Sequence, residues 1–125
     1  MVDEFGQTAL NVSIGTCGLQ TARLWLALGY DFGEKLPNGS DNVFMACEYD
    51  FVKALEFLKS EAMIPLFSTF DGVSTLEYSL RVASFKCFAY LIDYYIQNDV
   101  FLMNPYICQR VVNMLQAACK TLLWL

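Results

Sequence analysis

The chain has 125 residues, of which 56% are apolar and only 17% are charged, and its net charge is −5. This length suits a single domain, and the apolar share is above the roughly 45–50% usual for soluble domains. The acidic balance argues against sequence-independent binding to nucleic acids, which depends on clustered Lys and Arg.

A glycine recurs every 33 residues along the first three quarters of the chain, at Gly6, Gly39 and Gly72. Two residues after each glycine comes a side chain suited to capping a helix, namely Thr8, Asp41 and Ser74. A fixed period of this length is typical of proteins built from stacked repeats. Dividing the chain at this period gives units over about residues 3–35, 36–68 and 69–101.

Each unit is expected to hold two helices. The first helix of each unit begins at its capping residue. The second helices are expected over residues 19–28, 51–61 and 85–95, from apolar residues at helical spacing. Gly29 is a natural stop for the first of these second helices.

The period fails in the last quarter of the chain, where Pro105 stands at the next glycine position. Asn104 and Pro105 nonetheless form a strong helix start, since Asn caps and Pro fits the first helical position. Residues 105–125 contain no Gly and no further Pro. They are compatible with one long helix or with a truncated helix pair.

The sequence predicts no catalytic, cofactor-binding or metal-binding residues, so we expect no enzyme. It has no His, which is the commonest general base and metal ligand. It also lacks a Cys-x-x-Cys pair and any Gly-rich phosphate loop. The five cysteines, together with a start that does not read as a secretory signal, favour a reduced, intracellular and cytoplasmic location. No segment reads as a transmembrane span.

The units resemble ankyrin repeats, which pair two antiparallel helices after a turn and open the first helix with Thr-Pro-Leu-His. The corresponding segments here are residues 8–11 (Thr-Ala-Leu-Asn), 41–44 (Asp-Asn-Val-Phe) and 74–77 (Ser-Thr-Leu-Glu). The usual Gly between the two helices is shifted to Gly18 in the first unit and replaced by Asp50 and Ala83 in the next two. Because the motif His is missing, its hydrogen bonds between neighbouring turns must be absent or replaced.

The resemblance implies an all-α fold, an ankyrin-type α-solenoid of stacked helix-turn-helix units with short turn or hairpin fingers. Ankyrin partners usually contact the turn tips and exposed positions of the first helices. Carried onto this chain, the tips are Glu4, Phe5, Gln7, Pro37, Asn38, Ser40, Phe70, Asp71 and Val73. The first-helix positions include Glu48, Tyr49 and Arg81. Phe5 and Phe70 either anchor a partner or fold back over their own units.

The segment 121–125 carries four large apolar residues. It either caps the stack internally or docks on another chain, in which case Trp124 and Leu125 contact a partner. We therefore expect a non-catalytic scaffold for protein–protein interaction, a small subunit docked in a larger assembly, with no nucleic acid among its partners. The alternative is a regulatory or inhibitory module that binds an enzyme or transcription factor through its concave face, with the acidic N-terminal half on a basic patch.

Overall fold

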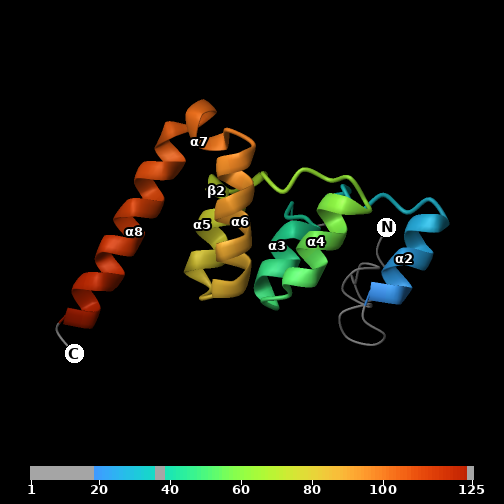
Figure 1. Cartoon of the computed structure of the whole chain (residues 1–125), viewed down its shortest axis with the longest axis horizontal. Helices are drawn as coiled ribbons and strands as arrows, with labels where there is room; N and C mark the ends of the chain where they lie inside the picture. Colours follow the sequence, from blue (N-terminus) through green and yellow to red (C-terminus); the bar gives the residue numbers. More distant parts are fainter. Residues whose placement is uncertain (1–18, 36–38, 124–125) are drawn as a thin grey trace.

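A computed structural model describes residues 19–35 and 39–123 and shows a mainly helical molecule, with its helices arranged in a row (Figure 1). This confirms the expected all-α class. The helices are α2 (Leu19–Ala27), α3 (Asn42–Glu48), α4 (Val52–Ser60), α5 (Thr75–Arg81), α6 (Phe85–Gln97), α7 (Val100–Met103) and α8 (Pro105–Leu123). Two short strands, β1 (Thr69–Phe70) and β2 (Val73–Ser74), form an antiparallel hairpin before α5.

The helices recur with the period expected from the glycines. Helices α2, α4 and α6 begin at Leu19, Val52 and Phe85, each 33 residues after the one before, and α3 and α5 begin at Asn42 and Thr75. Helix α3 packs on α4 and α5 packs on α6, while α3 also contacts α5 and α4 contacts α6. Equivalent helices of two consecutive units therefore lie against one another.

From residue 105 to residue 123 the chain forms one long helix, α8, rather than a helix pair. Helix α8 follows the single turn of α7 and packs against α5 and α7. The side-chain amide of Asn104 donates to the carbonyl oxygen of Val100 at 3.3 Å, so this hydrogen bond joins Asn104 to α7. The carbonyl oxygen of Asn104 accepts from the amide of Ile107 in the first turn of α8.

The capping predictions at Asp41 and Ser74 are confirmed. The Asp41 carboxylate accepts from the amides of Val43 and Phe44 at the start of α3. Ser74 accepts from the amide of Glu77, whose carboxylate in turn accepts from the amide of Ser74, forming a capping box. The cap predicted at Thr8 lies outside the described residues.

The hairpin before α5 is the turn finger expected for the third unit. Its strands pair Thr69 with Ser74 and Phe70 with Val73. The two residues at its tip, Asp71 and Gly72, have φ values of 54° and 78°. Positive φ at both positions suits a tight two-residue hairpin, for which Asp-Gly is a preferred sequence.

The turns between the paired helices use left-handed backbone at Asp50 and Ala83, with φ of 50° and 60°. These residues stand where ankyrin repeats usually have Gly. The turn after α3 closes with a 3.0 Å hydrogen bond from the amide of Phe51 to the carbonyl oxygen of Ala46. This bond matches the Schellman pattern, in which the left-handed position is normally Gly because a side chain there adds strain.

The core runs between the helix pairs and includes the fully buried side chains of Leu55, Leu58 and Leu91. Tyr95 of α6 is the largest fully buried side chain. Its hydroxyl accepts from the amide of Leu76 at 3.1 Å and shares a 2.6 Å hydrogen bond with the hydroxyl of Thr75. The polar end of this buried ring is therefore satisfied, and it fixes the start of α5 against α6.

We expect Ala83→Gly to raise the free energy of unfolding by about 1 kcal/mol, because it removes side-chain strain from a left-handed position. Ala83 is exposed, so the change leaves no cavity. Asp50→Gly is the matched comparison and should lower stability by about 1 kcal/mol net, since it also removes charged hydrogen bonds. Chemical denaturation of both variants checks this. If both variants change the free energy of unfolding equally and in the same direction, the prediction is wrong.

Candidate functional site

Half of the residues predicted to contact a partner can be placed. Glu4, Phe5, Gln7, Pro37, Asn38, Trp124 and Leu125 lie outside the described residues. The described ones divide between the two ends of the helix pairs. Ser40, Phe70, Asp71 and Val73 lie at the finger end, and Glu48, Tyr49 and Arg81 lie at or beside the turns between paired helices.

At the finger end, only Asp71 of the predicted contact residues is exposed. Ser40 is buried, with 8% of its surface exposed, and Val73 is half-buried. Phe70 packs on the preceding unit rather than over its own: its ring lies edge-on to Phe44 at a centroid distance of 6.1 Å and approaches Gly39. Of the described residues predicted to contact a partner, Asp71 is therefore the one that this end exposes.

The opposite end exposes larger side chains. Tyr49 is 54% exposed after α3, and Val82, at the equivalent position after α5, is 39% exposed. Phe85 begins α6 and is 63% exposed. Both turns lie at the same end of their helix pairs (Figure 1). We call Tyr49, Arg81, Val82 and Phe85 the turn edge. Phe85 was missed as a contact residue because its place in a helix pattern favoured burial.

A hydrogen bond between a tyrosine and a carboxylate joins two consecutive helix pairs next to the turn edge. The hydroxyl of Tyr78 on α5 donates to the carboxylate of Glu48 on α3 at 2.7 Å. Burial and this carboxylate raise the pKa of Tyr78 to about 12, so the phenol keeps its proton. The ring of Tyr78 also packs edge-on to Phe44 at 5.2 Å. This contact engages Glu48 and holds the ends of α3 and α5 together.

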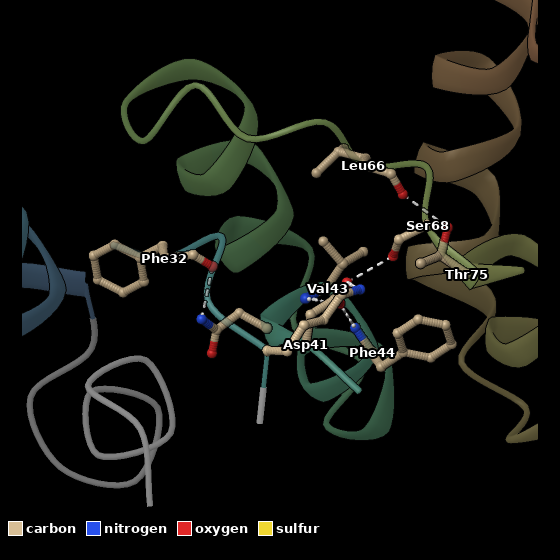
Figure 2. A network of polar contacts seen from close by, with 9 residues as sticks. Phe32, Asp41, Val43, Phe44, Leu66, Ser68 and Thr75 are labelled. Carbon is tan, nitrogen blue, oxygen red and sulfur yellow. Dashed lines mark hydrogen bonds and ion pairs between the residues drawn. The ribbon is translucent and has the colours of Figure 1, made fainter. Parts of the chain in front are cut away.

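Asp41 links three segments of the chain through its carboxylate (Figure 2). Besides capping α3, its carboxylate accepts a 2.7 Å hydrogen bond from the hydroxyl of Ser68, which precedes the next finger. The ammonium of Lys35 lies 3.3 Å from the same carboxylate oxygen. One side chain thus joins the start of a helix to the loops before and after it.

A second polar link recurs at the period of the repeat. The side-chain amide of Asn42 donates to the carbonyl oxygen of Phe32 at 2.9 Å. The hydroxyl of Thr75, 33 residues later, donates to the carbonyl oxygen of Leu66 at 2.8 Å (Figure 2). Each side chain is buried and belongs to the first residue of its helix. Each donates to a backbone carbonyl oxygen of the loop that precedes that helix. The paired polar residues at this spacing were the signal in the sequence that could have revealed this link.

Asp50 connects the second unit to the third. Its carboxylate accepts from the hydroxyl of Ser84 at 2.8 Å and from the amide of Cys87 at 3.1 Å. It therefore caps α6 from the preceding helix pair, whereas Ser84 itself makes no side-chain cap. Burial would raise the pKa of Asp50, but these hydrogen bonds and the nearby charge of Lys86 hold the pKa below its ordinary value of 3.8.

Glu77 connects the third unit to α8. Its side chain is 5% exposed and forms a two-pronged ion pair with the Arg110 guanidinium, with N–O distances of 2.9 and 3.0 Å. Burial would raise the pKa of Glu77. Its hydrogen bonds from Arg110 and Ser74 outweigh burial and hold the pKa below its ordinary value of 4.5. The carboxylate is therefore charged at neutral pH and fixes α8 on α5.

The cysteines and the acidic residues of the described part of the chain are candidates for metal ligands and reactive groups. No cluster of His, Cys, Asp or Glu among them could hold a metal ion. The thiols of Cys47 and Cys87 are buried, and the neighbouring Cys87 thiol together with burial raises the pKa of Cys47, which keeps it protonated. A surface hollow of about 420 Å³ lies between α2 and α4, but its Arg23 and Glu61 already pair at 2.9 Å.

Comparisons with known protein families, curated proteins and solved structures find no match for this chain. Among the described residues, no helix combines the length and the apolar character needed to cross a membrane. The all-α class is therefore assigned from the helices of the structure alone.

We expect Arg110→Met to lower the free energy of unfolding by about 2 kcal/mol at neutral pH, because it leaves the Glu77 carboxylate buried without its main partner. The pKa of Glu77 is depressed in the folded state, so the ion pair contributes stability above pH 4.5 and loses it as the pH falls through the folded-state pKa. The difference between variant and wild type should accordingly narrow in acid.

Denaturation curves of both proteins at pH 7 and at pH 3 measure this difference. Gln109→Met, on the same helix and exposed, is the matched control and should leave stability nearly unchanged. A difference between Arg110→Met and wild type that stays constant with pH would show that the lost packing of the arginine stem, rather than its charge, is responsible.

Proposed function

We propose that this chain is a non-catalytic scaffold for protein–protein interaction, a short ankyrin-type solenoid docked in a larger assembly. The stacking of equivalent helices at a 33-residue interval supports the solenoid. In such a stack each helix pair completes its core with its neighbours, and function resides on extended outer surfaces.

The observation that carries this proposal is the turn edge. Tyr49, Val82 and Phe85 expose large apolar surface at the same end of consecutive helix pairs. Aromatic residues are favoured anchors at protein interfaces, because they bury much area while losing little conformational freedom. The exposed Arg81 supplies a charged contact beside them.

The use of the acidic side chains favours this scaffold over the alternative of an inhibitory module with an acidic contact surface. Asp41 and Asp50 are occupied by hydrogen bonds within the fold, and Glu48 accepts from Tyr78. Fewer of the carboxylates in the N-terminal half are therefore open to a basic partner. An apolar interface predicts association that resists salt, since screening weakens only exposed charge pairs.

The test is capture of partner proteins by the immobilised chain, with Phe85→Ala and Tyr49→Ala as variants. Each should weaken capture of the same partner by tenfold or more, and high salt should change capture by wild type little. Ile96→Ala is the matched control, because Ile96 is 60% exposed at the other end of α6. Capture that survives both turn-edge variants, or that high salt abolishes, would contradict the proposal.

A further inference from the structure

Helix α8 has two apolar faces, and the described part of the chain covers only one of them. Ile107 and Val111 are 3% exposed and belong to the core. A second row, which we call the outer stripe, consists of Cys108, Val112, Leu115 and Cys119, all of them exposed. Val112, Leu115 and Cys119 line a shallow groove on this surface. The C-terminal half of α8 extends away from the helix pairs (Figure 1).

The spacing of the outer stripe is that of a helix–helix contact. Its members follow one another at intervals of four, three and four residues, which keeps them on one face of an α-helix. Apolar residues alternating at these intervals form the seam of a two-stranded coiled coil, where side chains of one helix fit between those of the other. The stripe therefore fits a second helix lying along α8.

The stripe is also complementary to itself. The four stripe residues are symmetric about the midpoint between positions 113 and 114. Val112 and Leu115 form the inner pair, and Cys108 and Cys119 form the outer pair. If two copies of α8 pair antiparallel about this midpoint, Val112 faces Leu115 of the second copy and Cys108 faces Cys119 of the second copy. This is the reciprocal pattern that a two-fold symmetric interface requires. We propose that the outer stripe binds a second copy of this chain, with the two α8 helices antiparallel.

The charges on α8 agree with this arrangement. Residues 105–120 contain no acidic residue, and their only cations are Arg110 and Lys120. Arg110 is neutralised by Glu77 of its own chain. Two antiparallel helices place their Lys120 residues at opposite ends, whereas parallel pairing would bring them side by side and repel. The four residues of the stripe are uncharged, and Lys120 is the one charged residue among those that line the groove beside them.

This inference goes beyond the proposed scaffold function and concerns a different surface from the turn edge. A failure to dimerise would leave partner capture through Tyr49 and Phe85 untouched. Loss of that capture would leave dimerisation untouched. The two proposals therefore fail separately.

Sedimentation equilibrium of the full chain over a range of concentrations tests the dimer. We expect wild type to dimerise and Val112→Glu to raise the dissociation constant more than tenfold, because symmetry buries the introduced carboxylate twice. Asn113→Glu adds the same charge one residue away, off the stripe, and should dimerise like wild type. Val112→Glu combined with Leu115→Lys should recover part of the affinity, because the opposite charges then face each other across the two copies.

Cross-linking tests the antiparallel orientation. In a Cys17→Ser background, diamide should join Cys108 of one copy to Cys119 of the second copy; the two thiols give up two protons and two electrons to diamide, which becomes the hydrazine. These residues are eleven apart on one helix, about 16 Å, whereas a disulfide requires Cα atoms within about 7 Å. The bond can therefore form only between copies.

Either Cys108→Ser or Cys119→Ser should abolish this cross-link. Parallel pairing would instead leave a dimer linked through the remaining cysteine. A chain that stays monomeric at the highest concentration reached, a dimer unaffected by Val112→Glu, or cross-links between identical cysteines would each overturn the proposal. Circular dichroism of every variant confirms that it keeps the helical fold.

Discussion

The fold depends on carboxylates that sit at the junctions between its helix pairs. Asp41 caps α3 and accepts from Ser68 of the next loop, and Asp50 caps α6 from the preceding helix pair. Glu77 completes the capping box of α5 and holds Arg110 of α8. Each junction thus satisfies the free amides of a helix start with a side chain that also reaches a neighbouring segment. Acidic side chains thus supply polar links between consecutive helix pairs.

The sequence could predict the helices because their signals are local. A glycine, a capping residue two positions later and apolar residues at helical spacing all act within one turn or two. For that reason the starts of α3 and α5, together with the caps at Asp41 and Ser74, were predictable. The contact from Asp50 to Cys87 and the pair of Glu77 with Arg110 join residues 37 and 33 positions apart. They depend on how the helix pairs stack, which no local pattern encodes.

The candidate site shows the same division between local and long-range information. Tyr49 and Arg81 could be placed on an exposed edge, because they end helices whose inner faces were clear from the sequence. Phe70 could not be assigned, because its ring packs on Phe44 of the preceding unit, a contact that no local pattern shows. Ser40 is buried as well, beside Asp41, whose carboxylate accepts from Ser68 of the loop that follows α4. Exposure at the fingers is set by the neighbouring unit.

The end of the row follows from the geometry of stacking. Helix α5 presents a face that a further helix pair would cover, and α8 takes this place alone, held by one buried ion pair and by Ile107 and Val111. A single helix closes the core with one apolar face. In α8 the next face is apolar as well, and no other described helix covers it. The exposed row Cys108, Val112, Leu115 and Cys119 therefore lies beside the buried row on the same helix, at the spacing of a helix–helix contact.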